Sequence, residues 1–329
     1  MELDGLVGAR VALRHRIGER DGRPLYSDAV GVLSTEGDAV VVAARRGPVR
    51  VERSAVVAVR AVPPAPPRRA SLTAVARLEN LCADAWPAQV DEPLGEWRLR
   101  AAGGYTGRAN AALAVGGPGM PVAAALDAVR AFGERTGTAP RVQVPMGSPW
   151  DRAVAGEGWI LDEAHEAGAE VSVEVVALAD LRRPAPSSEP VRRECRSSGI
   201  GVAARAEPAW WAVATGGDPS AAQRLVLDPR SSLPLAFLLA HGPDGAPAGA
   251  LRAALVADHL HLSALHVVPD ARRRGLGTAL LATAASWGRE RGARWGVAQV
   301  ALHNAGARAL YDRLGFTGHH RYRYLVPPF

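Results

Sequence analysis

The sequence contains no lysine, and only two of its 329 residues are cysteines. A chain without lysine has no P-loop, because that phosphate-binding motif requires Gly-Lys-Ser/Thr. Two cysteines, Cys82 and Cys195, exclude a disulfide framework and a four-thiolate zinc site. No apolar run approaches the roughly 18 residues of a membrane span. The N-terminal Met1-Glu2-Leu3-Asp4 also lacks the apolar stretch of a signal peptide, and we therefore expect a cytoplasmic protein that does not bind membranes.

All 39 basic residues are arginine, and 33 acidic residues leave a net charge of +6. Arginine stays charged and holds phosphate in a bidentate fork, so it suits nucleotides and acidic partners as well as nucleic acid. Acidic residues are mixed through the whole chain, and the excess of positive charge is small for a chain of this length. We therefore do not expect a nucleic-acid-binding protein. The sequence leaves the oligomeric state open.

Two proline-rich stretches, 63–69 and 184–190, indicate linkers, because proline ends helices and central strands. They divide the chain into blocks at 1–62, 70–183 and 190–329. The first block contains five short β-branched runs, and Glu36-Gly37-Asp38 between two of them indicates a hairpin turn. These runs predict a small all-β barrel of SH3-like type, with strands near 7–15, 29–33, 39–44, 49–51 and 56–62.

Short motifs of the second block recur in the third at a nearly constant offset. Leu99-Arg100-Ala101-Ala102 recurs as Leu251-Arg252-Ala253-Ala254, Gln143-Val144 recurs as Gln299-Val300, and Gly158-Trp159 corresponds to Gly315-Phe316. The shared order favours a tandem duplication, and chance similarity in a chain rich in Ala, Gly and Arg is the alternative.

Each copy has the pattern strand, strand, helix, strand, helix, strand, which predicts an α+β fold with a mixed sheet. In the third block we expect strands near 235–241, 248–256 and 259–268 and a helix from Leu276 to about Arg291. Leu280, Leu281, Ala284 and Trp287 share one face of that helix. A strand near 294–302, a helix at 305–314 and a strand near 318–326 should follow.

The segment between the third strand and the first helix of this block carries the clearest chemical signal. It reads Pro269-Asp270-Ala271-Arg272-Arg273-Arg274-Gly275-Leu276-Gly277-Thr278. Glycines allow a ligand to approach the backbone, and the helix N-terminus directs unpaired N–H groups at an anion. The segment predicts a phosphate or pyrophosphate site, and a glycine-capped helix with solvated arginines is the alternative. A dinucleotide fingerprint does not fit, because Leu280 stands where the third glycine would be.

This block resembles the GCN5-related N-acetyltransferase superfamily. Arg272, Gly275 and Gly277 match its Arg/Gln-x-x-Gly-x-Gly/Ala signature for coenzyme A. Asn304 and Leu310-Tyr311-Asp312-Arg313-Leu314-Gly315-Phe316 match its second signature. The whole layout also resembles actinobacterial acetyltransferases that have an SH3-like domain before tandem acetyltransferase-like halves. The resemblance implies 1–62 as an SH3-like barrel, 70–183 as a degenerate acetyltransferase-like domain and 190–329 as the catalytic domain.

The resemblance also implies roles for individual residues, with acetyl-CoA as co-substrate and no metal. Backbone groups of Leu265, His266 and Val267 would pair with the pantetheine arm, and the Val267 amide would polarise the thioester carbonyl. Asn304 would contact the pantetheine region, and Tyr311 would protonate the departing thiolate. Amides of the glycine-rich segment would hold the pyrophosphate, which assigns to the cofactor Arg272, Arg273, Arg274, Gly275, Leu276, Gly277 and Thr278.

The general base is less clear. His261 lies eleven residues before Arg272, at the position where histone-acetylating relatives carry a glutamate base, and imidazole suits proton removal near neutral pH. Water acting through a relay is the alternative. His259 and His261 share one strand face, but no third ligand follows, so we expect no metal site. Because the amine attacks directly, Cys195 is expected to be structural rather than catalytic.

The second block departs from the cofactor pattern. It has Gly116-Gly117-Pro118-Gly119-Met120-Pro121 in place of the arginine-rich loop, and Val154 occupies the tyrosine position. We expect this half not to bind acetyl-CoA but to wall the acceptor site. The polar stretch 103–110 is expected to be a structural hairpin, and a place in the acceptor pocket is the alternative.

These features favour an N-acetyltransferase that acts on a primary amine, with a small molecule favoured as acceptor. A protein or peptide acceptor is the first alternative. A non-catalytic acyl-CoA sensor or scaffold, in which the barrel recruits a partner, is the second.

Overall fold

The computed structural model describes residues 3–44, 47–62, 70–182 and 199–328. The predicted linkers and Cys195 lie outside these residues. The chain forms two compact units, Met1–Arg68 and Arg69–Phe329. No helix in the described part of the chain is long and apolar enough to cross a membrane.

The first unit is a five-stranded antiparallel sheet in the order β4-β3-β2-β1-β5. Val11, Leu13 and Val40 are among the residues of its core. All five predicted strands are present, and the β2–β3 hairpin turns at the predicted glycine, Gly37, which has φ +60°. The strands are β1 (Arg10–Arg20), β2 (Arg23–Glu36), β3 (Ala39–Ala44), β4 (Gly47–Glu52) and β5 (Val56–Ala61).

The first two strands are longer than the sequence predicted. They pair as a hairpin from Arg10↔Val32 to Arg20↔Arg23. Asp21 and Gly22 turn the chain with φ values of 53° and 75°. Both residue types adopt the left-handed region at low cost, which makes this two-residue connection possible.

The second unit is a mixed α+β structure built on one twelve-stranded sheet. Its described elements are α1 (Leu72–Ala85), β6 (Val90–Leu94), β7 (Trp97–Ala101), η3 (Gly107–Ala109), β8 (Ala112–Leu113), α2 (Val122–Thr136), β9 (Val142–Pro145), α3 (Pro149–Gly156), β10 (Ile160–Leu161), β11 (Glu170–Ala177), β12 (Gly201–Ala203), α5 (Pro208–Thr215), α6 (Ala221–Leu227), β13 (Leu235–His241), β14 (Pro247–Val256), β15 (His259–Val267), η4 (Pro269–Ala271), α7 (Leu276–Arg289), β16 (Trp295–Ala301), α8 (Ala305–Arg313) and β17 (Thr317–Val326). The elements predicted between 235 and 326 are confirmed to within a few residues at their ends.

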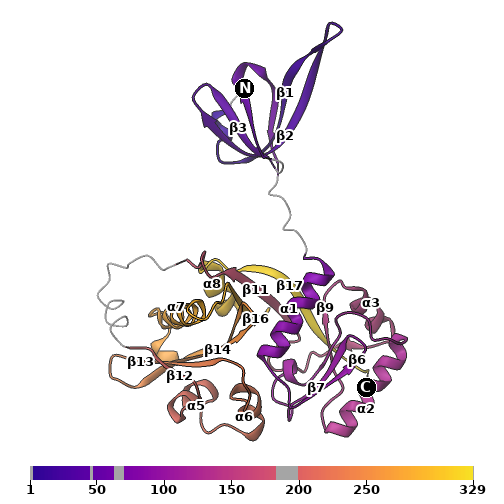
Figure 1. Ribbon diagram of the computed structural model, residues 1–329, viewed down its shortest axis with the longest axis vertical. Helices are drawn as coiled ribbons and strands as arrows, with labels where there is room; N and C mark the ends of the chain where they lie inside the picture. Colours follow the sequence, from indigo (N-terminus) through magenta and orange to yellow (C-terminus); the bar gives the residue numbers. More distant parts are fainter. Residues whose placement is uncertain (1–2, 45–46, 63–69, 183–198, 329) are drawn as a thin grey trace. The chain divides into compact units, whose positions relative to one another are not determined.

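The two recurring segments interlock through their last strands. Eleven strands follow the order β12-β13-β14-β15-β16-β11-β17-β9-β8-β7-β6, and the twelfth, β10, pairs with β17. Strand β11, which precedes residue 183, pairs with β16 along Val171↔Ala301 to Ala177↔Trp295. Strand β17, at the C-terminal end, pairs with both β11 and β9 (Figure 1). Each segment therefore places a strand inside the other segment's part of the sheet.

Helices cover both faces of the sheet around β13 to β15. Side chains alternate between the faces of a strand. Ala236 and Leu238 of β13 pack in one core with Leu280 and Leu281 of α7. Leu235 and Phe237 pack in another core with Trp210 and Trp211 of α5. Helix α7 and helix α5 consequently lie on opposite faces (Figure 1).

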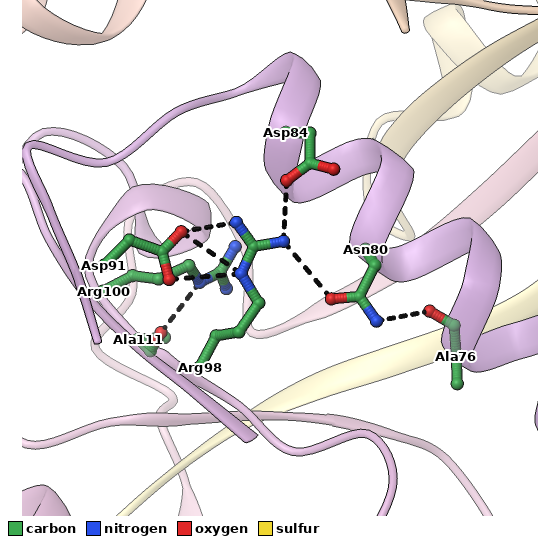
Figure 2. Close-up of polar contacts among 7 residues, drawn as sticks. All are labelled: Ala76, Asn80, Asp84, Asp91, Arg98, Arg100 and Ala111. Atoms are coloured by element: carbon green, nitrogen blue, oxygen red, sulfur yellow. Dashed lines mark hydrogen bonds and ion pairs between the residues drawn. The ribbon is translucent and has the colours of Figure 1, made fainter. Parts of the chain in front are cut away.

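Helix α1 is tied to the β6–β7 hairpin by Arg98 (Figure 2). Ser71 caps the start of the helix by accepting a hydrogen bond from the Ala74 amide. Arg98 Nη1 donates to Asp84 Oδ1 at 2.8 Å and to Asn80 Oδ1 at 3.3 Å, both on α1. Its Nε donates to Asp91 Oδ1 of β6 at 3.1 Å. These bonds fix the C-terminal end of α1, and Trp86 follows immediately.

A buried polar chain also joins α1 to the interlocked strands. Glu79, 1% exposed, accepts a hydrogen bond from Gln143 Nε2 of β9 at 2.6 Å. The other carboxylate oxygen of Glu79 lies 2.6 Å from His320 Nε2 of β17. Gln143 Oε1 in turn accepts from Arg100 Nη2 of β7 at 2.8 Å. Every group in this chain has a partner, which is what burial of polar side chains requires.

Candidate functional site

Strands β15 and β16 separate part of the way along their length. They pair in parallel only from His259↔Trp295 to Leu262↔Ala298, although β15 continues to Val267. Beside the point of separation, Ala264 has φ 49°, and the register with β14 shifts between Ala250 and Arg252. This geometry is a β-bulge, which bends the strand away from its neighbour. The predicted cofactor residues Leu265, His266 and Val267 follow the bulge, beyond the paired residues of β16.

The glycine-rich segment lies between β15 and the N-terminus of α7. Gly275 is the N-cap residue with φ 88°, and no side chain caps the helix. In the described residues, the backbone N–H groups of 273–278 donate to no backbone oxygen, whereas the next amide, Ala279, bonds to the Gly275 carbonyl at 3.0 Å. Arg273 also has a positive φ, 63°. A run of free amides at the positive end of a 14-residue helix suits a phosphate group.

The three arginines of the segment differ in their contacts. Arg272 Nε donates to the Val267 carbonyl at 2.9 Å, so this side chain ties the segment to the end of β15. Arg273 and Arg274 are exposed and form no ion pair in the described part of the chain. Gly277 serves close packing, because a Cβ there would lie 3.3 Å from Leu310 Cδ2 of α8.

Tyr311 and Asn304 both belong to α8. Tyr311 is 5% exposed, and its ring contacts Phe316 at 4.9 Å between centroids. Burial raises the pKa of Tyr311, and the charge of Arg108 opposes part of that rise. The phenol is therefore protonated at neutral pH. Asn304 caps the helix, because its Oδ1 accepts from the Ala307 amide at 3.0 Å.

His261 lies on the face of β15 opposite α7. Leu260 and Leu262, on either side of it, pack in the core that contains α7. His261 Nε2 lies 3.3 Å from Gln299 Oε1, which assigns its proton to Nε2, and the buried Nδ1 has no partner in the described residues. Burial, followed by the charges of Arg108 and Arg252, lowers the pKa of His261 to about 3. The imidazole is therefore neutral at pH 7.

The stretch 103–110 approaches this histidine, and it is not the hairpin that we expected. It contains the short 3-10 helix η3, and the Asn110 side chain holds the turn through the amides of Ala102 and Gly104. Arg108 Nη1 donates to Gln299 Oε1 at 3.5 Å. The Arg108 guanidinium carbon lies 4.6 Å from the centre of the Trp86 ring. The polarity of the stretch was a signal for this position, but only the packing shows which side chain reaches the separated strands.

The loop before α2 in the second block differs from the glycine-rich segment of the third. Before α2, the Glu96 carboxylate accepts a hydrogen bond from the Gly117 amide at 2.6 Å. Backbone of Pro118 lies 2.4 Å from where a Cβ on Gly95 would stand. Val154, which occupies the tyrosine position, is fully buried. The Glu96 carboxylate thus occupies one amide of the loop before α2, and Pro118 and Pro121 of that loop have no N–H group to donate.

A cavity of about 710 Å³ lies away from these residues, between β12, β13 and the C-terminal half of α7. Arg205, Leu233 and Trp287 are among its lining residues, and none of the predicted site residues lines it.

Comparisons with known proteins show the family and the fold. The protein-family model described as "Probable histone acetyltransferase Rv0428c C-terminal" matches residues 73–325. A GCN5-related N-acetyltransferase from Kribbella flavida is similar over 77% of this chain and 95% of its own, with 18% identity and a TM-score of 0.56. A GCN5-related N-acetyltransferase from Sphaerobacter thermophilus covers 66% of this chain and 73% of its own, with 22% identity and a TM-score of 0.45. No curated protein matches the chain.

Proposed function

The chain belongs to the Rv0428c C-terminal family and has the fold of a GCN5-related acetyltransferase, and from this premise we propose that it transfers an acetyl group from acetyl-CoA to a primary amine. The observation that carries the proposal is the combination of two features at one end of β15. The strands β15 and β16 separate there, and the free amides of 273–278 begin a few residues later. An extended thioester cofactor needs both an open strand edge and an anion site.

The chain's own groups fit such a cofactor. Amides of 273–278 bind the pyrophosphate, and Arg273 and Arg274 add charge beside it. Backbone of Leu265, His266 and Val267 pairs with the pantetheine arm, and the Val267 amide polarises the carbonyl. When bound, acetyl-CoA supplies an acetyl thioester that an amine can attack with loss of the CoA thiolate.

Proton transfer is assigned to groups on both sides of the separated strands. The Tyr311 hydroxyl makes no hydrogen bond within the described residues, and it donates its proton to the leaving thiolate. The ammonium of the acceptor loses its proton to His261 Nδ1, with a water relay as the alternative. His261 is a weak base in the free chain because of its lowered pKa. The new bond joins nitrogen to the carbonyl carbon, and the bond that breaks is the carbon–sulfur bond. The second proton that the nitrogen loses as the amide forms restores the Tyr311 hydroxyl.

We assign the whole cofactor site to 190–329, and 70–183 to a degenerate tandem copy that supports it. Both segments share the order strand, helix, parallel strand and helix, which is β8-α2-β9-α3 in one and β15-α7-β16-α8 in the other, and this shared order supports a duplication. The lack of arginine in the loop 116–121, and its two prolines without N–H groups, support loss of cofactor binding in the second block. The first unit, 1–62, keeps its assignment as an SH3-like module.

Titration calorimetry with acetyl-CoA tests the cofactor site. We expect one site per chain and a large loss of affinity in Arg273→Glu, because a carboxylate beside the free amides repels pyrophosphate. Arg291→Glu, beyond the far end of α7, is the matched control and should bind normally. Two sites per chain would contradict the assignment of 70–183.

Turnover separates an enzyme from an acyl-CoA sensor. Tyr311→Phe should lower kcat by about 10²- to 10⁴-fold, the contribution of a positioned general acid, while the Kd for acetyl-CoA stays the same. Tyr26→Phe, in the first unit, is the control. Normal acetyl-CoA binding without transfer to any amine or peptide would favour the sensor.

A further inference from the structure

Six side chains gather on the face of the sheet opposite α7, next to the separated strands. This group, which we call the Trp86 cluster, consists of Trp86, Tyr105, Arg108, Arg252, His261 and Gln299. Arg108 and Arg252 both lie against the Trp86 ring, with guanidinium carbons 4.6 Å and 5.1 Å from its centre. The His261 ring centre lies 6.1 Å from that of Trp86. Two cations thus share one aromatic side chain beside the proposed base.

Arg252 is completely buried, and its charge is not balanced by an ion pair. Its exposed fraction is 0%. Nε donates to the Leu227 carbonyl at 2.7 Å and Nη1 to the Ala85 carbonyl at 3.0 Å. Its Nη2 is buried without any partner in the described residues. A buried guanidinium normally has a carboxylate partner, because an uncompensated buried charge is costly.

Arg108 adds a second unbalanced cation. It is partly buried, and within the described part of the chain it contacts the neutral groups of Gln299 and Trp86. Neither it nor Arg252 forms an ion pair with a carboxylate in the described part of the chain. The nearby Asp228 pairs instead with Arg205 at 3.2 Å. Burial, followed by the charge of Arg108, lowers the pKa of Arg252 to about 9, and the charge of Asp228 opposes part of that fall.

The second block provides an internal comparison. Arg100 occupies the position of Arg252 in the recurring Leu-Arg-Ala-Ala motif, and Gln143 corresponds to Gln299. In that copy, Arg100 bonds to Gln143 and Gln143 bonds to the carboxylate of Glu79. In the third block Arg252 and Gln299 form no hydrogen bond with each other within the described residues. Gln299 accepts from Arg108 instead, and no carboxylate bonds to Arg108, Arg252 or Gln299 in that part of the chain. The chain therefore supplies a carboxylate to one copy and leaves the other without one.

We propose that the Trp86 cluster binds a carboxylate group of the acceptor, so that the substrate is a small amine carrying a carboxylate. Arg108 and the free Nη2 of Arg252 bind the two oxygens, as guanidinium groups bind carboxylates generally. The Trp86 ring packs on the carbon atoms of the substrate between its carboxylate and its amine. This inference rests on the proposed function, because the cluster contains His261, the proposed base. Burial lowers the pKa of His261 and the charge of Arg108 lowers it further, while the same charge opposes part of the rise that burial causes in the pKa of Tyr311, the proposed acid.

The carboxylate site can be tested without the acyl donor. Butyrate carries the carboxylate but no amine, and its binding is followed by the quenching of tryptophan fluorescence and by the melting temperature. We expect saturable binding that weakens at least about tenfold in Arg108→Gln, the effect of losing a charge-assisted hydrogen bond. Arg291→Gln is the matched control, because Arg291 lies over Trp287 at the same 4.6 Å. Equal binding in both variants would overturn the proposal.

The second arm compares acceptors in the acetyl-transfer reaction. ω-Amino acids of two to six carbons are assayed beside alkylamines of equal length. At one length the amino acid should have a kcat/KM at least about tenfold higher, and Arg108→Gln should remove that preference mainly through KM. Equal rates for amines with and without a carboxylate would overturn the inference and leave the acetyltransferase assignment intact. A preference for aminoalkyl phosphates would also overturn it.

The two arms separate the possible failures. Arg108-dependent butyrate binding in a chain that acetylates nothing would support the anion site and overturn the proposed function. Because Arg252 is fully buried, Arg252→Gln is used only if its circular dichroism matches that of the parent chain.

Discussion

Replacing Glu79 by leucine should lower the free energy of unfolding of the second unit by about 3 kcal/mol. Glu79 accepts hydrogen bonds from Gln143 and from His320, both at 2.6 Å, and is 1% exposed. Leucine leaves both donors unpaired, at a cost of about 1–3 kcal/mol each. Burial of the leucine side chain offsets roughly 1.5 kcal/mol of that cost.

Glutamine in the same place should cost only about half as much, because it can still accept from Gln143 while its own amide donates to the other tautomer of His320. The order Glu, Gln, Leu is thus expected to be an order of decreasing stability. It distinguishes a loss of hydrogen bonds from a change of packing, since glutamine keeps the shape of glutamate.

Urea unfolding followed by tryptophan fluorescence measures this prediction. All eight tryptophans lie between residues 86 and 295, so the signal reports the second unit and not the first. Glu134→Leu, at an exposed position of α2, is the control and should change stability by less than about 0.5 kcal/mol. A loss below about 1 kcal/mol in Glu79→Leu would refute the view that this buried chain holds the interlocked strands together.

Three further predictions concern the site. Gly275→Ala should lower the free energy of unfolding by about 1–2 kcal/mol through its φ of 88° alone, since its Cβ would meet nothing within 4 Å. Gly107→Ala should lower the melting temperature more than Gly275→Ala does, because its Cβ would lie 2.7 Å from Tyr324 Cζ. The pKa of His261 falls from 6.5 to about 3 on folding, so its contribution to the free energy of unfolding is complete above pH 6.5 and should fall by about 2 kcal/mol by pH 5. In urea unfolding at a series of pH values, His261→Gln should remove this part of the loss. An unchanged dependence of the free energy on pH would contradict the burial of a neutral imidazole. Burial raises the pKa of the Cys82 thiol, so in a Cys195→Ser background no thiol should react with Ellman's reagent before the chain unfolds.

The local elements could be predicted because their signals lie within a few residues. The helix at Leu276 follows from apolar periodicity and a preceding glycine, and the observed α7 begins at that residue. The glycine-rich segment before this helix and the signature 310–316 could be recognised for the same reason, because each is written in consecutive residues. The long β1–β2 hairpin was missed because its turn, Asp21-Gly22, lies between polar strand ends that carry no apolar alternation.

The long-range arrangement was not available from such signals. Pairing of β11 with β16 joins residues about 124 positions apart along the chain (Val171↔Ala301 to Ala177↔Trp295), and alternation alone does not specify a partner strand. Arg108 likewise reaches Gln299 across 191 positions. Its place beside Trp86 depends on how the turn of 103–110 packs against the third block, which no local pattern encodes.

The interlocked strands make the segment 70–182 structurally indispensable, whatever ligand it does or does not bind. If residues 70–182 were removed, β16 would lose β11 and present a seven-residue open edge, and such an edge invites pairing with other chains and aggregation. Natural variation can therefore erode the ligand-binding groups of this segment while its strands remain essential. A gene that carries this arrangement cannot be shortened to its third block by a single deletion, and fragments expressed separately should fold only when they are mixed and refolded together.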